Sequence, residues 1–93
     1  MNMVPIALFR IGKIVVTPKA LARLTQQDVL NGMRRHLAGD WGEVDEYDRQ
    51  VNYRALAQGG RLCSAYCSVN RIAFWLITEA DRSVTTVLLA EEY

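Results

Sequence analysis

The sequence predicts an α+β fold in which an antiparallel sheet of about four strands carries two or three helices on one face. Three observations lead to this class: a run rich in Ile and Val near the N-terminus, capped helical patterns in the middle, and three short apolar runs near the C-terminus. The 93 residues are 51% hydrophobic, which suits one small domain over residues 1–93 with a single core.

The first strand is predicted over about residues 6–16, where IALFRIGKIVV has a high content of β-branched side chains. Gly12 indicates a bend or a bulge in that strand. Thr17 and Pro18 then have the residue types preferred at the N-cap and the first position of a helix, which predicts a short helix over about 18–24.

A second helix is predicted over about residues 27–38, with Thr25 as its N-cap. Gly39 falls where a left-handed residue would close this helix. Its last turn contains Arg34, Arg35 and His36, where positive charge suits the helix dipole. A turn at residues 40–42 precedes a third helix, predicted over about 44–57.

Three strands are predicted from RLCSAYCSV, RIAFWLITEA and SVTTVLLA, joined around Asn70 and around Asp81-Arg82. They form an antiparallel meander that the N-terminal strand joins. Alternation along the middle strand places Phe74 and Leu76 on one face and Trp75 on the other, so both faces are apolar. We expect helices on one face and a partner or another element on the other, and a homodimer is one candidate arrangement.

Composition excludes several classes of protein. No apolar run approaches the roughly 20 residues that a membrane span needs, and the N-terminal segment lacks the features of a secretory signal, which indicates a cytoplasmic protein without a membrane partner. Cys63 and Cys67 are four residues apart on one predicted strand, too far for a disulfide. With one His and two Cys, the chain cannot build a four-ligand zinc site, and we expect neither a metal nor a cofactor.

Charge is unevenly distributed along the chain. Residues 1–36 carry a net charge of +5 and residues 37–60 a net charge of −3. Candidate nucleic-acid contacts in the basic part are Lys13, Lys19, Arg23, Arg34 and Arg35. Such polarity steers charged partners, although no segment is basic enough to indicate nucleic-acid binding by itself.

Five of the ten acidic residues lie between positions 40 and 48, in the sequence DWGEVDEYD. The order of residues does not match a calcium-binding EF-hand loop. A helix junction explains the cluster most simply, because acidic side chains favour a helix N-terminus. A catalytic carboxylate pair and an acidic binding surface stay open, and the candidate interaction surface consists of Asp40, Trp41, Glu43, Asp45, Glu46, Tyr47 and Asp48.

Two aromatic or ionisable residues near this cluster have alternative interpretations. Trp41 lies in a turn between Gly39 and Gly42 and either plugs the core or anchors an interface, and the first fits better. His36 is expected to be a residue of the helix C-terminus, since a catalytic role would need a Ser or Cys brought in by the fold. The sequence contains no nucleophile elbow, phosphate loop or dinucleotide fingerprint.

The segment TEADRSVTT links the last two strands and is the other polar stretch. Ordinary turn chemistry is the favoured explanation, because Asp and Ser satisfy the backbone of such connections. A ligand-binding turn is the alternative, with the candidate residues Glu79, Asp81, Arg82 and Ser83.

GDWG, RLCSAY and WLITEADRSVTTVLLAEEY together resemble a family of uncharacterised proteins of about 90 residues that are associated with plasmids and prophages. The resemblance covers roughly residues 11–93 and implies no catalytic residue. It implies a setting on mobile genetic elements, where small proteins commonly act by binding.

These observations lead to three functional hypotheses. The first is a non-catalytic interaction module, an accessory or inhibitor protein that binds a host nucleic-acid-processing defence complex of the CRISPR or restriction type. The second is a small nucleic-acid-binding or toxin–antitoxin component that uses the basic N-terminal half. The third is a small enzyme that uses His36 or the carboxylates.

Overall fold

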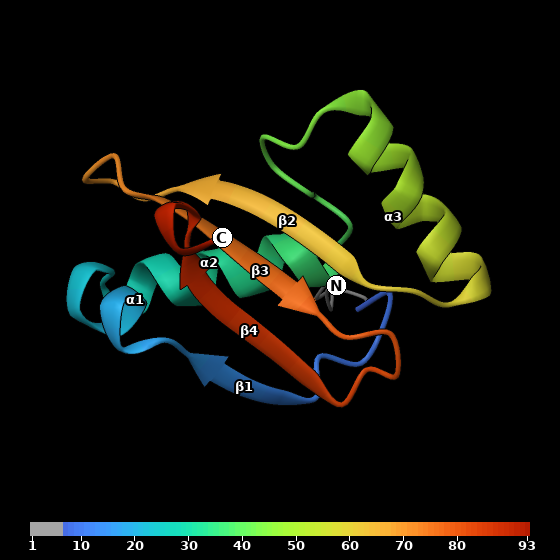
Figure 1. Ribbon diagram of the computed structural model, residues 1–93, viewed down its shortest axis with the longest axis horizontal. Helices are drawn as coiled ribbons and strands as arrows, with labels where there is room; N and C mark the ends of the chain where they lie inside the picture. Colours follow the sequence, from blue (N-terminus) through green and yellow to red (C-terminus); the bar gives the residue numbers. More distant parts are fainter. Residues whose placement is uncertain (1–6) are drawn as a thin grey trace, which may run out of the picture.

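The computed structural model describes residues 7–93 and has the predicted α+β architecture (Figure 1). A four-stranded sheet has the order β1-β4-β3-β2. Its strands are β1 (Lys13–Val16), β2 (Leu62–Cys67), β3 (Ala73–Thr78) and β4 (Val84–Leu89). The helices are α1 (Pro18–Arg23), α2 (Gln26–Leu37), α3 (Glu46–Gln58) and the short 3₁₀ helix η1 (Ala90–Glu92).

The C-terminal meander is confirmed, and its strands pair in antiparallel fashion from β2 to β3 to β4. β1 joins β4, but it runs parallel to that strand, from Lys13 opposite Val84 to Val16 opposite Val87. The sheet is therefore mixed. The intervening chain carries all three α-helices before returning, which is long enough for a parallel connection.

The first strand is shorter than the predicted range 6–16. Residue 6 lies outside the described residues, and residues 7–12 form no strand. Gly12 has a positive φ of 68°, and the preceding segment turns toward the end of α2, where the Leu8 N–H donates to the Leu37 carbonyl at 2.9 Å. A pleated strand cannot continue through that left-handed residue, so β1 begins at Lys13.

Local capping signals explain where the helices begin and end. The hydroxyls of Thr17 and Thr25 accept the N–H groups of Ala20 and Asp28, so both predicted N-caps are confirmed. At the end of α2, the Gly39 N–H donates to the His36 carbonyl and the Asp40 N–H to the Arg35 carbonyl. This pair of bonds, with φ of 79° at Gly39, is a Schellman closure.

The two faces of the sheet are covered differently. α2 lies behind the sheet in Figure 1, and the main core between helices and sheet contains Ala20, Leu24, Tyr66, Phe74, Leu76, Val87 and Leu89. The opposite face carries η1 and the ring of Tyr93, whose centroid is 4.5 Å from that of Trp75. This face is therefore covered in part by residues 90–93 of the same chain.

α3 lies along the edge strand β2 (Figure 1). Its buried Asn52 side chain bonds both backbone groups of Cys63, at 2.8 and 3.0 Å. Next along β2, the Ala65 N–H donates to the Trp41 carbonyl at 3.0 Å and the Ala65 carbonyl accepts the Glu43 N–H at 2.8 Å. These bonds close the outer edge of β2 against further strand pairing.

The approach of residues 41–43 to β2 requires glycine at position 42. A Cβ atom there would lie 2.0 Å from the Ala65 carbonyl oxygen, whereas a Cβ at Gly39 would approach the flexible end of Leu8 at 2.8 Å and the Trp41 ring at an ordinary 3.9 Å. Both glycines have similar positive φ values, 73° and 79°. The two positions therefore share backbone strain and differ in steric contact.

We expect Gly39→Ala to lower the free energy of unfolding by about 1–2 kcal/mol through left-handed backbone strain. Gly42→Ala should cost at least about 2 kcal/mol more, because the added methyl also separates residues 41–43 from β2. Urea unfolding of both variants measures the difference. Equal losses in the two variants would contradict the close approach at Ala65.

Candidate functional site

A continuous chain of polar side chains crosses the interior of the protein. The His36 ring contacts the Ser64 hydroxyl through Nδ1 at 2.5 Å and the Thr78 hydroxyl through Nε2 at 2.8 Å. Thr78 contacts Thr85 at 2.7 Å, and the Thr85 hydroxyl donates to the Ile11 carbonyl at 2.6 Å. This chain joins α2 to β2, β3, β4 and the segment before β1.

The donors in this chain fix the tautomer of His36. The Ile11 carbonyl can only accept, so Thr85 donates to it and must accept from Thr78. Thr78 then accepts from His36 Nε2, which carries the ring proton, and Nδ1 accepts the Ser64 hydroxyl. Every group is satisfied when the imidazole is neutral.

Burial keeps His36 neutral. Its side chain is 0% exposed and lies edge-on to the rings of Phe9 and Trp41, at centroid distances of 5.1 and 5.7 Å. Desolvation, aided by the positive charge of Arg82, lowers the pKa of His36 to about 4. The predicted position of His36 in the last turn of α2 is confirmed, but its neutral ring belongs to the core and adds no positive charge to the helix end.

Ser64, Thr78 and Thr85 were not recognised as partners of His36 from the sequence. All three are fully buried, on strands whose alternation points them toward α2. The inward positions could have been read from that alternation. Which of them meets the histidine depends on contacts 28 and 42 residues apart along the chain.

Turn chemistry accounts for the candidate ligand turn between β3 and β4. Asp81 accepts both the N–H and the hydroxyl of Ser83, at 3.0 and 2.6 Å, and the Arg82 backbone is left-handed with φ of 62°. The Arg82 guanidinium donates to the carbonyls of Gly60 and Ala55, at 2.6 and 3.1 Å. Arg82 thus connects this turn to the end of α3. The Arg82 guanidinium also donates to the Glu79 carbonyl at 3.1 Å.

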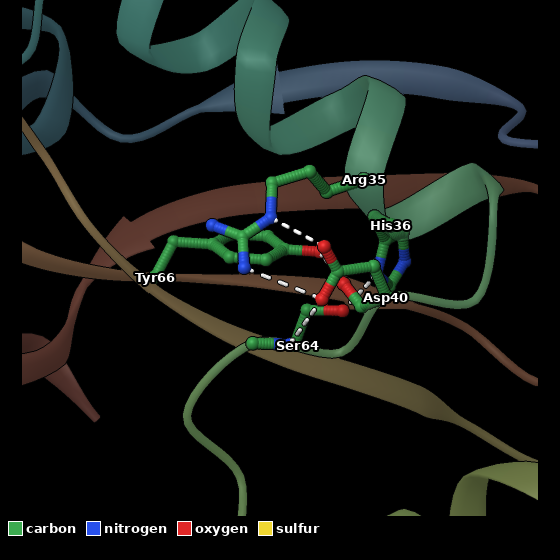
Figure 2. A network of polar contacts seen from close by, with 6 residues as sticks. Arg35, His36, Asp40, Ser64 and Tyr66 are labelled. Atoms are coloured by element: carbon green, nitrogen blue, oxygen red, sulfur yellow. Dashed lines mark hydrogen bonds and ion pairs between the residues drawn. The ribbon is translucent and has the colours of Figure 1, made fainter.

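Asp40 and Arg35 form an ion pair at the end of α2 (Figure 2). Two contacts of 2.7 and 3.3 Å join the guanidinium to the carboxylate, and the guanidinium carbon lies 4.6 Å from the centroid of the Tyr66 ring. The Arg35 hydrogen bond holds the pKa of Asp40 below its ordinary value. The Tyr66 hydroxyl donates to the Asp40 carbonyl at 2.6 Å, which fixes the turn against β2.

The other acidic residues of the stretch surround the start of α3. Asp45 is the N-cap and accepts the Asp48 N–H at 2.8 Å, so the predicted helix junction is confirmed. Glu46 pairs with Arg49 at 3.3 Å. Tyr47 is 73% exposed.

Trp41 is the one residue of the candidate interaction surface that lies in the core. It is 3% exposed and packs with Ala55 and Leu62 in a second apolar cluster. Its alternative role as an exposed anchor is therefore wrong. The bulky indole fills the space between α2, α3 and β2, where a smaller side chain would leave a cavity.

A groove of about 530 Å³ lies between the start of α3 and the sheet face opposite α2. Glu43, Asp45 and Asp48 line it, together with Arg61. Its apolar lining includes Val44, Val51, Ala65, Trp75 and Tyr93. The acidic stretch and the sheet face opposite α2 therefore meet at one site.

Cys63 also lines this groove, and Cys67 lies further along β2. Both thiols are free, and burial raises the pKa of Cys63, which keeps its sulfur protonated at neutral pH. Within residues 7–93, His, Cys, Asp and Glu side chains form no group of three that could hold a metal ion.

The candidate nucleic-acid contacts are distributed over three elements. Lys13 begins β1, Lys19 and Arg23 lie on α1, and Arg34 and Arg35 lie in the last turn of α2. Arg23 approaches Glu91 at 3.9 Å and Arg35 is paired with Asp40. The paired residues present less free positive charge than the sequence indicates.

Comparisons with known proteins found no relative of this chain: no family model matches it, and neither the curated proteins nor the solved structures contain a significant match. The resemblance to mobile-element proteins stays a prediction. Of the helices among residues 7–93, none has the length and apolar character needed to cross a membrane.

The stability of the protein should fall as the pH is lowered from about 6.5 toward 4. In this range the unfolded state gains a proton on His36 while the folded state does not. The contribution of His36 to the free energy of unfolding is therefore highest above pH 6.5 and falls by about 3 kcal/mol as the pH approaches 4. Urea unfolding between pH 7.5 and 4.5 measures this loss.

His36→Gln is the matched variant for this pH dependence, because it removes the titrating group while retaining polar side-chain atoms. It should be less stable at pH 7.5 and should lose less stability on acidification than the wild type. Parallel stability curves for the two proteins would show that His36 does not carry the effect.

Proposed function

We propose that this protein is a non-catalytic interaction module from a mobile genetic element, which acts as an accessory or inhibitor of a host nucleic-acid-processing defence complex. The observation that carries the proposal is the groove whose lining combines three acidic residues with apolar ones. Interfaces of nucleic-acid-processing proteins are rich in basic residues, and an acidic surface complements them in charge.

Burial supports a binding role over catalysis. His36 and Ser64 form the arrangement closest to a base and a nucleophile, yet both side chains are 0% exposed. Their hydrogen bonds belong to the buried series of polar contacts that ends at the Ile11 carbonyl. A substrate would have to open the core to reach either group.

The distribution of ion pairs supports the same choice of surface. Asp40 and Glu46 are neutralised by Arg35 and Arg49. Glu43 and Asp48 form no ion pair with any residue from 7 to 93 and remain available to a partner. Tyr47, with 73% of its surface exposed, adds an aromatic side chain beside them.

The double variant Glu43→Lys/Asp48→Lys should abolish binding while leaving the fold intact. It retains the Asp45 cap and the Glu46–Arg49 pair, so only the weak dipole interaction of the first turn of α3 is lost. We expect recovery of the host complex by the tagged protein from a host lysate to fall at least about tenfold, as followed by mass spectrometry.

Glu79→Lys/Glu91→Lys is the matched control, since it changes the net charge equally at residues outside the groove. It should recover the complex as the wild type does. Equal recovery by all three folded proteins, or recovery of no defence complex by the wild type, would overturn the proposed function.

A further inference from the structure

The groove carries an excess of negative charge beside an aromatic pair. Its lining contains three acidic residues, Glu43, Asp45 and Asp48, and one cation, Arg61, which together have a net charge of −2. The Arg61 guanidinium donates to the Tyr93 hydroxyl at 2.8 Å and forms no ion pair with the described residues 7–93. Carboxylates gathered at an apolar surface repel one another, and a bound cation would relieve that repulsion.

On the other side of β2, the protein itself holds a cation, the Arg35 guanidinium, between an aromatic ring and a carboxylate. There, the Arg35 guanidinium lies over the Tyr66 ring at 4.6 Å and contacts the Asp40 carboxylate at 2.7 Å (Figure 2). The ring face and the carboxylate bind the same planar ion in two different directions. Both interactions are strengthened by partial removal of water.

The groove offers the same two partners for a guanidinium from outside. Trp75 and Tyr93 present neighbouring rings, 4.5 Å between centroids and tilted by 40°, and Asp48 and Glu43 supply unpaired carboxylates. Strand addition is not available as a binding mode here, since Trp41, Glu43 and Asn52 occupy the outer edge of β2. Recognition must therefore use side chains.

We infer that this groove binds an arginine side chain on a basic segment of a partner protein. Arginine suits the site better than lysine, because a planar guanidinium stacks on aromatic rings and forms paired hydrogen bonds with a carboxylate. The existence of a partner protein rests on the proposed function. The inference adds which side chain of that partner contacts the groove. Affinity should fall as salt screens the carboxylates.

The test is a titration of the ¹⁵N-labelled full chain with a capped hexapeptide that contains two arginines among leucine and glycine. The indole N–H signal of Trp75, which lines the groove, should shift, while the signal of the buried Trp41 stays in place. A peptide with citrulline in place of arginine has nearly the same shape without the charge and should bind at least about tenfold more weakly.

Asp45→Asn/Asp48→Asn removes two of the carboxylates while Asn preserves the N-cap of α3, so the fold should be retained. This variant should bind the arginine peptide about tenfold more weakly, and Glu79→Gln/Glu91→Gln should bind it as the wild type does. Equal binding of the citrulline peptide, an unmoved Trp75 signal, or equal affinity of the Asn variant would each overturn the inference.

Two further outcomes separate this inference from other occupants and from the proposed function. A dimer of the free protein that dissociates in Asp45→Asn/Asp48→Asn would make a second copy the occupant and would overturn the arginine site. Recovery of a host complex without any peptide binding would overturn the arginine site alone. Peptide binding without a host complex would overturn the proposed function and retain the site.

Discussion

The neutral imidazole of His36 is the interaction on which the rest of the structure depends. It lies where α2 crosses two strands, and its two nitrogens use opposite hydrogen-bonding roles that only the uncharged ring provides. Through Thr78 and Thr85 the same chain reaches the Ile11 carbonyl, just before β1. A buried network with every member satisfied favours one arrangement of its elements, because any shift leaves a polar group without a partner.

Much of the fold could be predicted because it follows local rules. Thr17, Thr25 and Gly39 mark helix ends through contacts within a few residues, and the meander follows from alternation and short turns. The parallel partner of β1 could not be predicted, since pairing across the whole chain leaves no local signal. The burial of His36 was missed for the same reason, because its partners come from strands far along the sequence.

The acidic stretch both forms the junction between two helices and lines the groove, and the sequence pattern alone does not separate these two roles. Asp40 and Asp45 are used within the fold, one in the pair with Arg35 and the other as the cap of α3. Glu43 lies between these two structural residues and Asp48 follows Asp45, and both line the groove. A helix junction and a charged groove are therefore compatible interpretations of the same residues. The aromatic side of that groove comes from Trp75 and Tyr93, which no motif near the acidic stretch indicates.

The parallel pairing of β1 with β4 also has a consequence for biosynthesis. Lys13 pairs with Val84, so β1 is translated well before β4 and must wait for that strand before it gains its partner. Until then Ile14 and Val16, which pack against the main core, remain on an unpaired edge. Sheets closed by such distant contacts form slowly, and β1 is paired only after β4 has been translated.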